Sequence, residues 1–566
     1  MTYSNEQREP YSWLTEQSRK FLNNGYLVDG QSAESRIFDI AITAESILKK
    51  EGFAEKFIDY MSKGYFSLSS PVWSNFGLER GLPISCFGSY IEDSTASILY
   101  TGAEVGLMSK MGGGTSGYFG AIRGRGAPIK NNGESNGSFS FARIFDNTVD
   151  VISQGTTRRG QFAGYIDIEH PDIEEWLEIQ LEGNPIQLMF YGICVGDNWM
   201  SEMIAGDRKK RKIWAKVIQC RSEIGSPYIF FKDTVNENTS EAYKKNKSKI
   251  WASNLCSEIA LPSNKDESFV CCLSSMNLLH FEEWKDTDAV EVLTYFLDAV
   301  VSEFIEKLEL MRDSDDDGDL KFALMKRAYT FAKRHRAIGI GALGWHSLLQ
   351  SRMIEFDSME AMMLNARVFK TIEQRTKLAS KDLANIHGEP EMCIGTGYRN
   401  ATTMAIAPTK SSAFILGQVS QGIEPILSNY YVQDLAKIKD TYKNIYLENL
   451  LKLKDANTPD IWESILVRDG SVQHLDCLNE HEKNVFKTFS EISQLAVVQQ
   501  AAQRQKFIDQ SQSLNLMIHP NTPTKDINAI HIKAWELGVK TLYYQNSVNA
   551  AQELNRDLLN CSSCEG

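Results

Sequence analysis

The chain has 566 residues, of which 42% are hydrophobic and 23% charged, and its formal net charge is −13. This length supports a large core with two or three sub-domains, and the acidic balance argues against a general nucleic-acid or membrane surface. The N-terminal sequence has no signal-peptide pattern, no apolar run reaches about 18 residues, and ten cysteines are too few and too irregularly spaced for a disulfide scaffold. We therefore expect a cytoplasmic protein whose special cysteines are reactive rather than structural.

The order of predicted elements indicates an α/β protein. Residues 1–66 carry apolar side chains at helical spacing and are predicted to form a helical N-terminal domain. From residue 67 to 546, short apolar runs alternate with Gly- and Ser-rich turns and with longer amphipathic stretches such as 288–311, which is typical of strands alternating with helices. Residues 547–566 have weak periodicity and are predicted to form a flexible tail.

The stretch "ASNLCSEIALP" (252–262) is the first candidate for chemistry. If it is extended, Asn254, Cys256 and Glu258 share one face, because side chains alternate along a strand. A half-buried strand with a packed cysteine is the simpler interpretation of the thiol alone. This interpretation does not explain Glu258, because burying a carboxylate that has neither a function nor a partner costs on the order of several kcal/mol.

At this point the sequence resembles the catalytic (large, alpha) subunit of ribonucleotide reductase, most closely the class I form that lacks an N-terminal ATP-cone. The resemblance covers nearly the whole chain. It implies a ten-stranded α/β barrel built from two antiparallel five-stranded halves, with a loop carrying Cys256 threaded through it. The stretches that carry it are "SNLCSEIALP", "CCLSSMNL", "NGSFSFARIFDNT", "SQGTTRRG", "RAIGIGALGW", "QGIEP", "KFIDQSQSLNL" and "GVKTLYYQN".

The resemblance implies radical chemistry at Cys256. In the family, the matching cysteine becomes a transient thiyl radical that abstracts hydrogen from C3′ of a ribonucleotide. Glu258 would be the general base on the 3′-hydroxyl, and Asn254 would hydrogen-bond the substrate hydroxyl and the ketone intermediate. The 2′-hydroxyl then leaves as water, and a dithiol must supply two electrons.

That dithiol is expected at Cys86 and Cys271. Cys272 adjoins Cys271 and is the alternative, but the following "LSSMN" aligns with the family pattern one residue beyond it, which favours Cys271. The C-terminal pair Cys561 and Cys564 would exchange with the resulting disulfide and be reduced outside by thioredoxin or glutaredoxin.

The radical is expected to arrive along a tyrosine pair. Adjacent tyrosines in a strand are commonly packing residues. In class I reductases the matching pair, here Tyr544 and Tyr543, relays the radical from a separate small (beta) subunit to Cys256. The chain shows no metal-binding cluster of its own, so we expect no metal site and a radical-generating partner.

The family's nucleotide sites match further positions. Contacts to the substrate, a ribonucleoside diphosphate, are expected at Ser70, Ser85, Gly114, Thr409, Ser411 and Ser412. A dNTP or ATP specificity effector with Mg²⁺, bound at a homodimer interface, is expected at Asp93, Arg123, Ser153 and Arg159. No cofactor is expected to be covalently bound, and the absence of a "V-x-K-R-x-G"-like stretch predicts no overall on/off site in this chain.

The predicted function is reduction of ribonucleoside diphosphates under allosteric specificity control. One alternative is a cobalamin-dependent class II reductase, which needs no partner subunit. Another is a general thiol-disulfide oxidoreductase built on the tail pair, and a third is a nucleotide-binding regulator without chemistry. The oxidoreductase alternative leaves Asn254, Glu258 and the tyrosine pair unexplained, and a regulator without chemistry would keep its function after Cys256→Ser.

Overall fold

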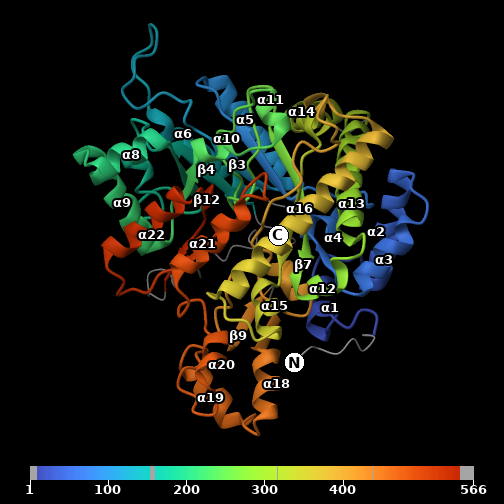
Figure 1. Cartoon of the computed structure of the whole chain (residues 1–566). Helices are drawn as coiled ribbons and strands as arrows, with labels where there is room; N and C mark the ends of the chain where they lie inside the picture. Colours follow the sequence, from blue (N-terminus) through green and yellow to red (C-terminus); the bar gives the residue numbers. More distant parts are fainter. Residues whose placement is uncertain (1–8, 153–159, 315–316, 436–437, 548–566) are drawn as a thin grey trace.

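A computed structural model describes residues 9–152, 160–314, 317–435 and 438–547 (Figure 1). Three helices precede the first strand: α1 (Glu16–Asn23), α2 (Ala33–Leu48) and α3 (Phe53–Ser62). Thr15 and Ser32 cap α1 and α2 by accepting a backbone N–H, and α2 buries Ile37, Ile40 and Ala44 on one face. The helical start is therefore confirmed, while the domain limits at 66 and 546 stay predictions.

The first half of the barrel is five parallel strands in chain order. Each strand is joined to the next through at least one helix, the connection that parallel pairing requires. The strands are β2 (Cys86–Tyr90), β3 (Gly114–Tyr118), β4 (Phe162–Asp167), β5 (Phe190–Val195) and β6 (Tyr228–Phe231). The connecting helices are α5 (Thr95–Lys110), α6 (Gly137–Val151), α7 (Ile173–Trp176), α8 (Asp197–Ala205) and α9 (Arg208–Ile224).

The second half runs antiparallel to the first. Strand β7 (Phe269–Asn277) pairs antiparallel with β2, and β8 (Ile338–Leu343) pairs parallel with β7. Isolated parallel bridges then join β8 to segment 402–406 and this segment to segment 510–517. Segment 510–517 ends in β11 (Leu516–Met517), which pairs parallel with β13 (Gln545–Asn546), while β12 (Thr541–Leu542) pairs antiparallel with β6.

These pairings close a ring of ten strand segments. Five parallel segments (β2 to β6) face five others (β7, β8, 402–406, 510–517 and 541–546) that run in the opposite direction. The predicted barrel of two antiparallel five-stranded halves is therefore confirmed. Isolated bridges replace continuous ladders on one side, where backbone hydrogen bonds such as Ile406 N–H to Ser511 O (3.0 Å) hold the ring together.

Long helices cover the second half. Helix α13 (Ala289–Arg312), predicted from 288–311, packs against α2, α14 (Gly318–His335), β7 and α16 (Met359–His387). The strand β1 (Phe66–Leu68) pairs antiparallel with the far end of β7. Other shorter helices are α4 (Ser70–Asn75), α10 (Lys232–Glu237), α11 (Glu241–Lys245), α12 (Phe281–Trp284), α15 (Trp345–Ser351), α17 (Lys410–Ile415), α21 (Gln494–Gln505) and α22 (Thr524–Glu536). Of these, α10 packs against α8, β5 and β6 of the first half, and α22 packs against α9 and α21.

A small lobe projects from the barrel, at the bottom of Figure 1. It comprises the hairpin β9 (Tyr430–Leu435) and β10 (Ile438–Lys443) with helices α18 (Ile445–Leu453), α19 (Pro459–Val467) and α20 (Glu480–Val485). Its core is separate and includes Leu447, Trp462 and Phe486. Across the described part of the chain, no helix combines the length and apolarity needed to cross a membrane.

Candidate functional site

The loop 252–262 lies inside the barrel and is not a strand. Ser257 has a left-handed backbone (φ 69°), and its N–H points to Asn254 O at 3.4 Å in a turn. Tyr165 Oη donates to Asn254 O (2.6 Å), and Ser511 N–H donates to Glu258 O (2.9 Å), so both halves of the barrel hold the loop. The premise that this stretch is extended is therefore wrong, because the turn at Ser257 interrupts the alternation of side chains.

The same turn brings the polar side chains together. Asn254 Nδ2 donates to Glu258 Oε1 (2.9 Å) and to Cys86 Sγ (3.1 Å). Ser513 Oγ lies 3.0 Å from Glu258 Oε2 and 2.5 Å from Cys256 O. Cys256, Glu258 and Asn254 are 6%, 1% and 0% exposed. Asn254 thus donates to one carboxylate oxygen of Glu258, and the single hydroxyl hydrogen of Ser513 is shared between the other oxygen and Cys256 O. These contacts reduce the cost of burying the carboxylate.

Cys86 and Cys271 lie opposite each other in the β2–β7 pairing, and both are present as thiols. Cys271 faces the barrel interior, where Gln510 Nε2 lies 3.7 Å from its Sγ. The next residue, Cys272, points the other way, and its Sγ lies 3.4 Å from Leu297 O on α13. Burial, first of all, raises the pKa of the Cys271 thiol well above its ordinary value. The alternation along β7 therefore favours Cys271 over Cys272 as the partner of Cys86.

Tyr543 and Tyr544 are in ring contact, with centroids 4.4 Å apart. Tyr228 on β6 contacts both rings, at 4.7 Å and 5.1 Å, and the sequence analysis missed it because an aromatic strand residue carries no distinguishing signal. Tyr543 N–H donates to the carbonyl oxygen of Leu514 (2.9 Å), and Leu514 directly follows Ser513 in the chain. The tyrosine segment is thereby the direct neighbour of the segment that contacts the Cys256 loop.

The predicted substrate residues on the β2–β3 side lie beside the Cys256 loop. Gly114 N–H donates to Ser85 O at 2.9 Å. A Cβ on Gly114 would lie 3.3 Å from Leu255 Cδ2, so the missing side chain leaves space for the loop itself. Ser85 Oγ is buried with no hydrogen-bond partner among the described residues.

The other predicted substrate residues gather around α17. Thr409, at φ 58°, precedes this helix and accepts Gly422 N–H on its Oγ1 (2.8 Å), while Ser412 Oγ donates to Leu68 O (3.4 Å). Helix α17 packs against β1, which leads directly to Ser70 at the start of α4. Within the described ranges, Ser411 Oγ is buried without a partner. Ser69 Oγ and Ser274 Oγ share this property, and the sequence analysis missed both.

Two of the four predicted effector residues form an ion pair. Arg123 Nε lies 2.7 Å from Asp93 Oδ2, and Arg123 N–H donates to Asp93 Oδ1 (3.2 Å). Asp93 follows β2 and Arg123 follows β3, so adjacent parallel strands deliver them to the same end of the sheet. The side chains are about one-third exposed, at 33% and 39%. Ser153 and Arg159, like Cys561 and Cys564 in the tail, lie outside the described residues.

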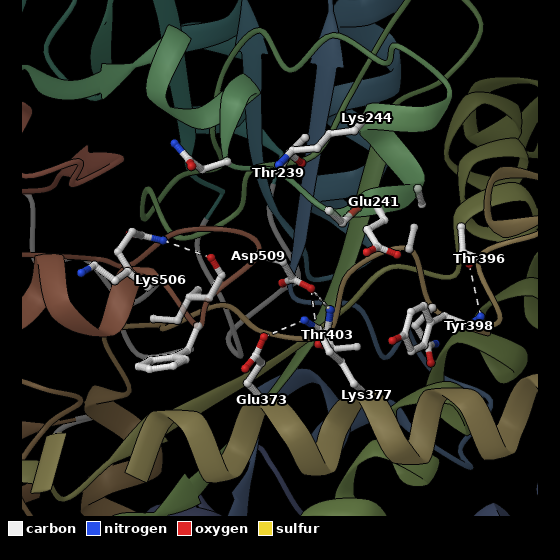
Figure 2. Close-up of a pocket in the computed structure, with 18 of the residues that line it drawn as sticks. Thr239, Glu241, Lys244, Glu373, Lys377, Thr396, Tyr398, Thr403, Lys506 and Asp509 are labelled. Carbon is white, nitrogen blue, oxygen red and sulfur yellow. Dashed lines mark hydrogen bonds and ion pairs between the residues drawn. The ribbon is translucent and has the colours of Figure 1, made fainter. Parts of the chain in front are cut away.

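A cavity of about 430 Å³ opens at the barrel end where segments 402–406 and 510–517 begin (Figure 2). Its lining includes Glu373 and Lys377 of α16, Lys244 of α11, Thr403 and Asp509. Predicted site residues are missing from this lining. Over the described ranges, no group of three or more His, Cys, Asp or Glu side chains could hold a metal ion.

Two family models match the chain. The model of the ribonucleotide reductase all-alpha domain matches residues 12–81. The model of the ribonucleotide reductase barrel domain matches residues 84–210, 204–395 and 390–545. These matches cover both the helical start and the ring of ten segments.

Whole-length relatives agree with this assignment. The solved structure of the Actinobacillus ureae class Id ribonucleotide reductase alpha subunit is 58% identical, with a TM-score of 0.90 over 98% of this chain and 100% of that chain. The putative ribonucleoside-diphosphate reductase large subunit of Frog virus 3 (isolate Goorha) is 34% identical over 91% of this chain and 93% of the relative. The ribonucleoside-diphosphate reductase large subunit of Invertebrate iridescent virus 3 is 33% identical over 93% of this chain and 92% of the relative. The chain therefore belongs to the ribonucleotide reductase family as a large subunit, of class I rather than the cobalamin-dependent class II.

Proposed function

We propose that this chain reduces ribonucleoside diphosphates to deoxyribonucleotides in the cytoplasm, with Cys256 as the hydrogen-abstracting residue. The observation that carries the proposal is the buried cluster in which Asn254 joins Glu258 and Cys86 beside the Cys256 backbone. Such a cluster brings a thiol, a carboxylate and an amide to one point in the barrel.

The proposed roles follow from the chemistry of each group. The Cys256 thiyl radical abstracts hydrogen from C3′ of the ribose and later returns a hydrogen there. Glu258 accepts the proton of the 3′-hydroxyl, and Asn254 donates to the oxygen as it becomes a ketone. Water leaves from C2′ as Cys86 and Cys271 supply two electrons and form a disulfide, which their opposite positions on β2 and β7 permit.

Substrate binding is proposed at the buried serines around α17 and β2. The hydroxyls of Ser85 and Ser411 are without partners in the described structure, and a nucleotide would supply acceptors for them. Ser70 begins α4 directly after β1, Thr409 and Ser412 belong to α17 and its cap, and α17 packs against β1. Gly114 leaves space for Leu255 of the Cys256 loop.

Reduction and radical supply require other proteins in this proposal. The tail pair Cys561 and Cys564 exchanges with the Cys86–Cys271 disulfide and is re-reduced by thioredoxin or glutaredoxin. A small (beta) subunit supplies the radical through Tyr544 and Tyr543, whose ring contact suits stepwise transfer.

Specificity control is proposed at the paired Asp93 and Arg123, which fit the ribose and phosphate of a dNTP or ATP effector bound with Mg²⁺. The neighbouring helices α5 and α6 expose Leu99 and Val151 at 56% and 81%. These apolar side chains support a homodimer in which this face is covered.

One assay tests the proposal. The purified chain is incubated with CDP and dithiothreitol, with either a class I radical-generating subunit or adenosylcobalamin. We expect dCDP only with the subunit. Formation of dCDP with adenosylcobalamin alone, or no dCDP with any class I subunit, would contradict the proposed function.

A further inference from the structure

Gln510 connects the two parts of the redox centre. Its Nε2 lies 3.7 Å from Cys271 Sγ, and its Oε1 accepts Ala260 N–H (3.3 Å) from the loop that carries Cys256. The side chain is fully buried, as is the Cys271 thiol. The amide orientation is fixed because Nε2 also donates to Ile338 O at 3.0 Å, where an amide oxygen would be repelled.

The side-chain amide nitrogen of Gln510 has three acceptors within reach but only two hydrogens to donate. Besides Cys271 Sγ and Ile338 O, Nε2 lies 3.0 Å from Thr402 Oγ1, although it carries only two N–H groups. Thr402 Oγ1 lies 3.2 Å from Ile338 O and can itself donate there. One N–H of Gln510 can therefore turn toward the sulfur when the sulfur gains charge, without leaving a buried acceptor unpaired.

The backbone around Gln510 is held in place. Lys540 Nζ donates to the carbonyls of Ile508 (3.2 Å), Asp509 (2.7 Å) and Gln510 (2.7 Å). The Asp509 carboxylate accepts the backbone N–H of Thr403 (2.7 Å) and of Met404 (2.9 Å), and Figure 2 shows Asp509 beside Thr403 above α16. The backbone of Gln510 is thus fixed, and only a rotation of its side-chain amide is needed to turn an N–H toward Cys271 Sγ.

We propose that Gln510 stabilises the departing Cys271 thiolate when the Cys86–Cys271 disulfide is re-reduced. This inference rests on the proposed function, which assigns that disulfide. Cys86 is the more exposed residue, at 5% against 0% for Cys271, so we take Cys86 as the residue that the incoming thiolate attacks. Cys271 then leaves with the electron pair, next to the N–H of Gln510.

The step balances as an ordinary exchange of disulfides. A tail thiolate forms an S–S bond with Cys86 as the Cys86–Cys271 bond breaks. The second tail thiol then attacks the mixed disulfide and expels Cys86. The tail dithiol is oxidised, the internal disulfide is reduced, and the two tail protons end on Cys86 and Cys271. The high pKa of the Cys271 thiol makes it a poor leaving group, and the Gln510 hydrogen bond acts against this.

The first experiment compares Gln510→Leu and Gln510→Glu with Gln512→Leu. Gln512 is a matched control because it is buried in the same segment but donates to Ala501 O and Gln505. Pre-reduced enzyme is assayed for dCDP in the first turnover, and the turnover-oxidised chain is assayed for re-reduction by dithiothreitol. We expect both Gln510 variants to slow re-reduction by about tenfold, since hydrogen bonds to charged groups have about this effect. The first-turnover rate should fall by less than the re-reduction rate in the Gln510 variants, and both rates should stay within about twofold in Gln512→Leu.

The two proposals fail in different ways. Absence of first-turnover dCDP in the unsubstituted enzyme contradicts the proposed function. Re-reduction that slows no more than the first turnover in the Gln510 variants overturns only the role of Gln510.

A second measurement does not depend on the folding of Gln510 variants. Cys564→Ser in the full chain blocks the second exchange step, so the Cys561 mixed disulfide accumulates and is mapped by mass spectrometry. A Cys561–Cys86 linkage is expected. A Cys561–Cys271 linkage would make Cys86 the leaving group and overturn the inference.

Discussion

Cys86 and Cys271 are directly opposite residues in the antiparallel pairing of β2 and β7. Opposite residues in such a pair have Cα atoms about 4.5–5.5 Å apart and side chains on the same face. This separation lies within the range that a disulfide spans. The junction between the two barrel halves therefore places the two thiols where they can be oxidised together.

This position makes the two adjacent cysteines of β7 a matched pair for mutation. Cys271→Ser should abolish thioredoxin-dependent multiple turnover, because the disulfide with Cys86 cannot form. Cys272→Ser should keep most of the activity, because Cys272 faces α13 outside the barrel. The activity of both variants is measured as steady-state dCDP formation. Loss of activity in Cys272→Ser but not in Cys271→Ser would make Cys272 the partner of Cys86.

The ring contact between Tyr543 and Tyr544 predicts that their hydroxyls are needed for radical transfer but not for binding of the small subunit. Tyr543→Phe and Tyr544→Phe each keep the ring but lose the hydroxyl that radical transfer needs, so dCDP formation should fall to background. Binding of the small subunit, followed by analytical ultracentrifugation, should be unchanged. Tyr228→Phe is the packing control because Tyr228 contacts both rings. Full activity in either of the first two variants would exclude the proposed route.

The Asp93–Arg123 pair predicts a selective loss of effector response. Arg123→Ala should weaken effector binding by about tenfold, since charge-assisted hydrogen bonds to phosphate contribute about 1.5–3 kcal/mol each. Basal CDP reduction should be kept. Arg125→Ala is the control, because Arg125 instead pairs with Glu175 at 2.7 Å. Isothermal titration with dNTPs checks this, and equal weakening in both variants would argue against a specific site.

Glu267 predicts a pH-dependent contribution to stability. Burial opposes its ionisation, but hydrogen bonds from His335 and Asn264 and the charge of Arg334 outweigh burial and lower the pKa of Glu267 to about 2. A carboxylate whose pKa is lowered on folding stabilises the folded protein at pH values above its unfolded pKa of about 4.5. This stabilisation is lost as the pH falls toward the folded pKa of about 2.

Glu267→Gln should therefore reduce the free energy of unfolding by about 2 kcal/mol at pH 7, and by less at lower pH. Urea unfolding of both proteins from pH 7 to pH 3 measures the difference. A gap that stays constant over this range would show that Glu267 acts through packing and not through its charge.

The alternation of strands and helices predicted the α/β class, and the resemblance of the quoted stretches to the family implied the barrel. The sequence could not predict the local path of residues 252–262. Period-two alternation indicated an extended segment, whereas the turn at Ser257, with its φ of 69°, brings Asn254 and Glu258 together. A left-handed serine carries no sequence signal, because glycine or asparagine is the usual residue there.

Other residues of the site could not be predicted because their contacts form only in the tertiary structure. Gln510, Ser513 and Tyr228 reach the Cys256 loop, Cys271 or the tyrosines only after the barrel has closed, from segments distant in sequence. Each is an ordinary polar or aromatic residue within its own strand. The choice between Cys271 and Cys272 came from alignment with the family pattern, and β7 supplies the physical reason, since neighbouring strand residues face opposite sides.

Replacing Cys256 by serine tests the central claim most directly. The change removes one sulfur and keeps the size, so the Asn254–Glu258–Ser513 cluster and the melting temperature should be kept. We predict that Cys256→Ser, assayed with the small subunit, CDP and dithiothreitol, forms no dCDP above background, while Cys220→Ser, at a buried cysteine on α9, remains active. Undiminished dCDP formation by Cys256→Ser would contradict the account.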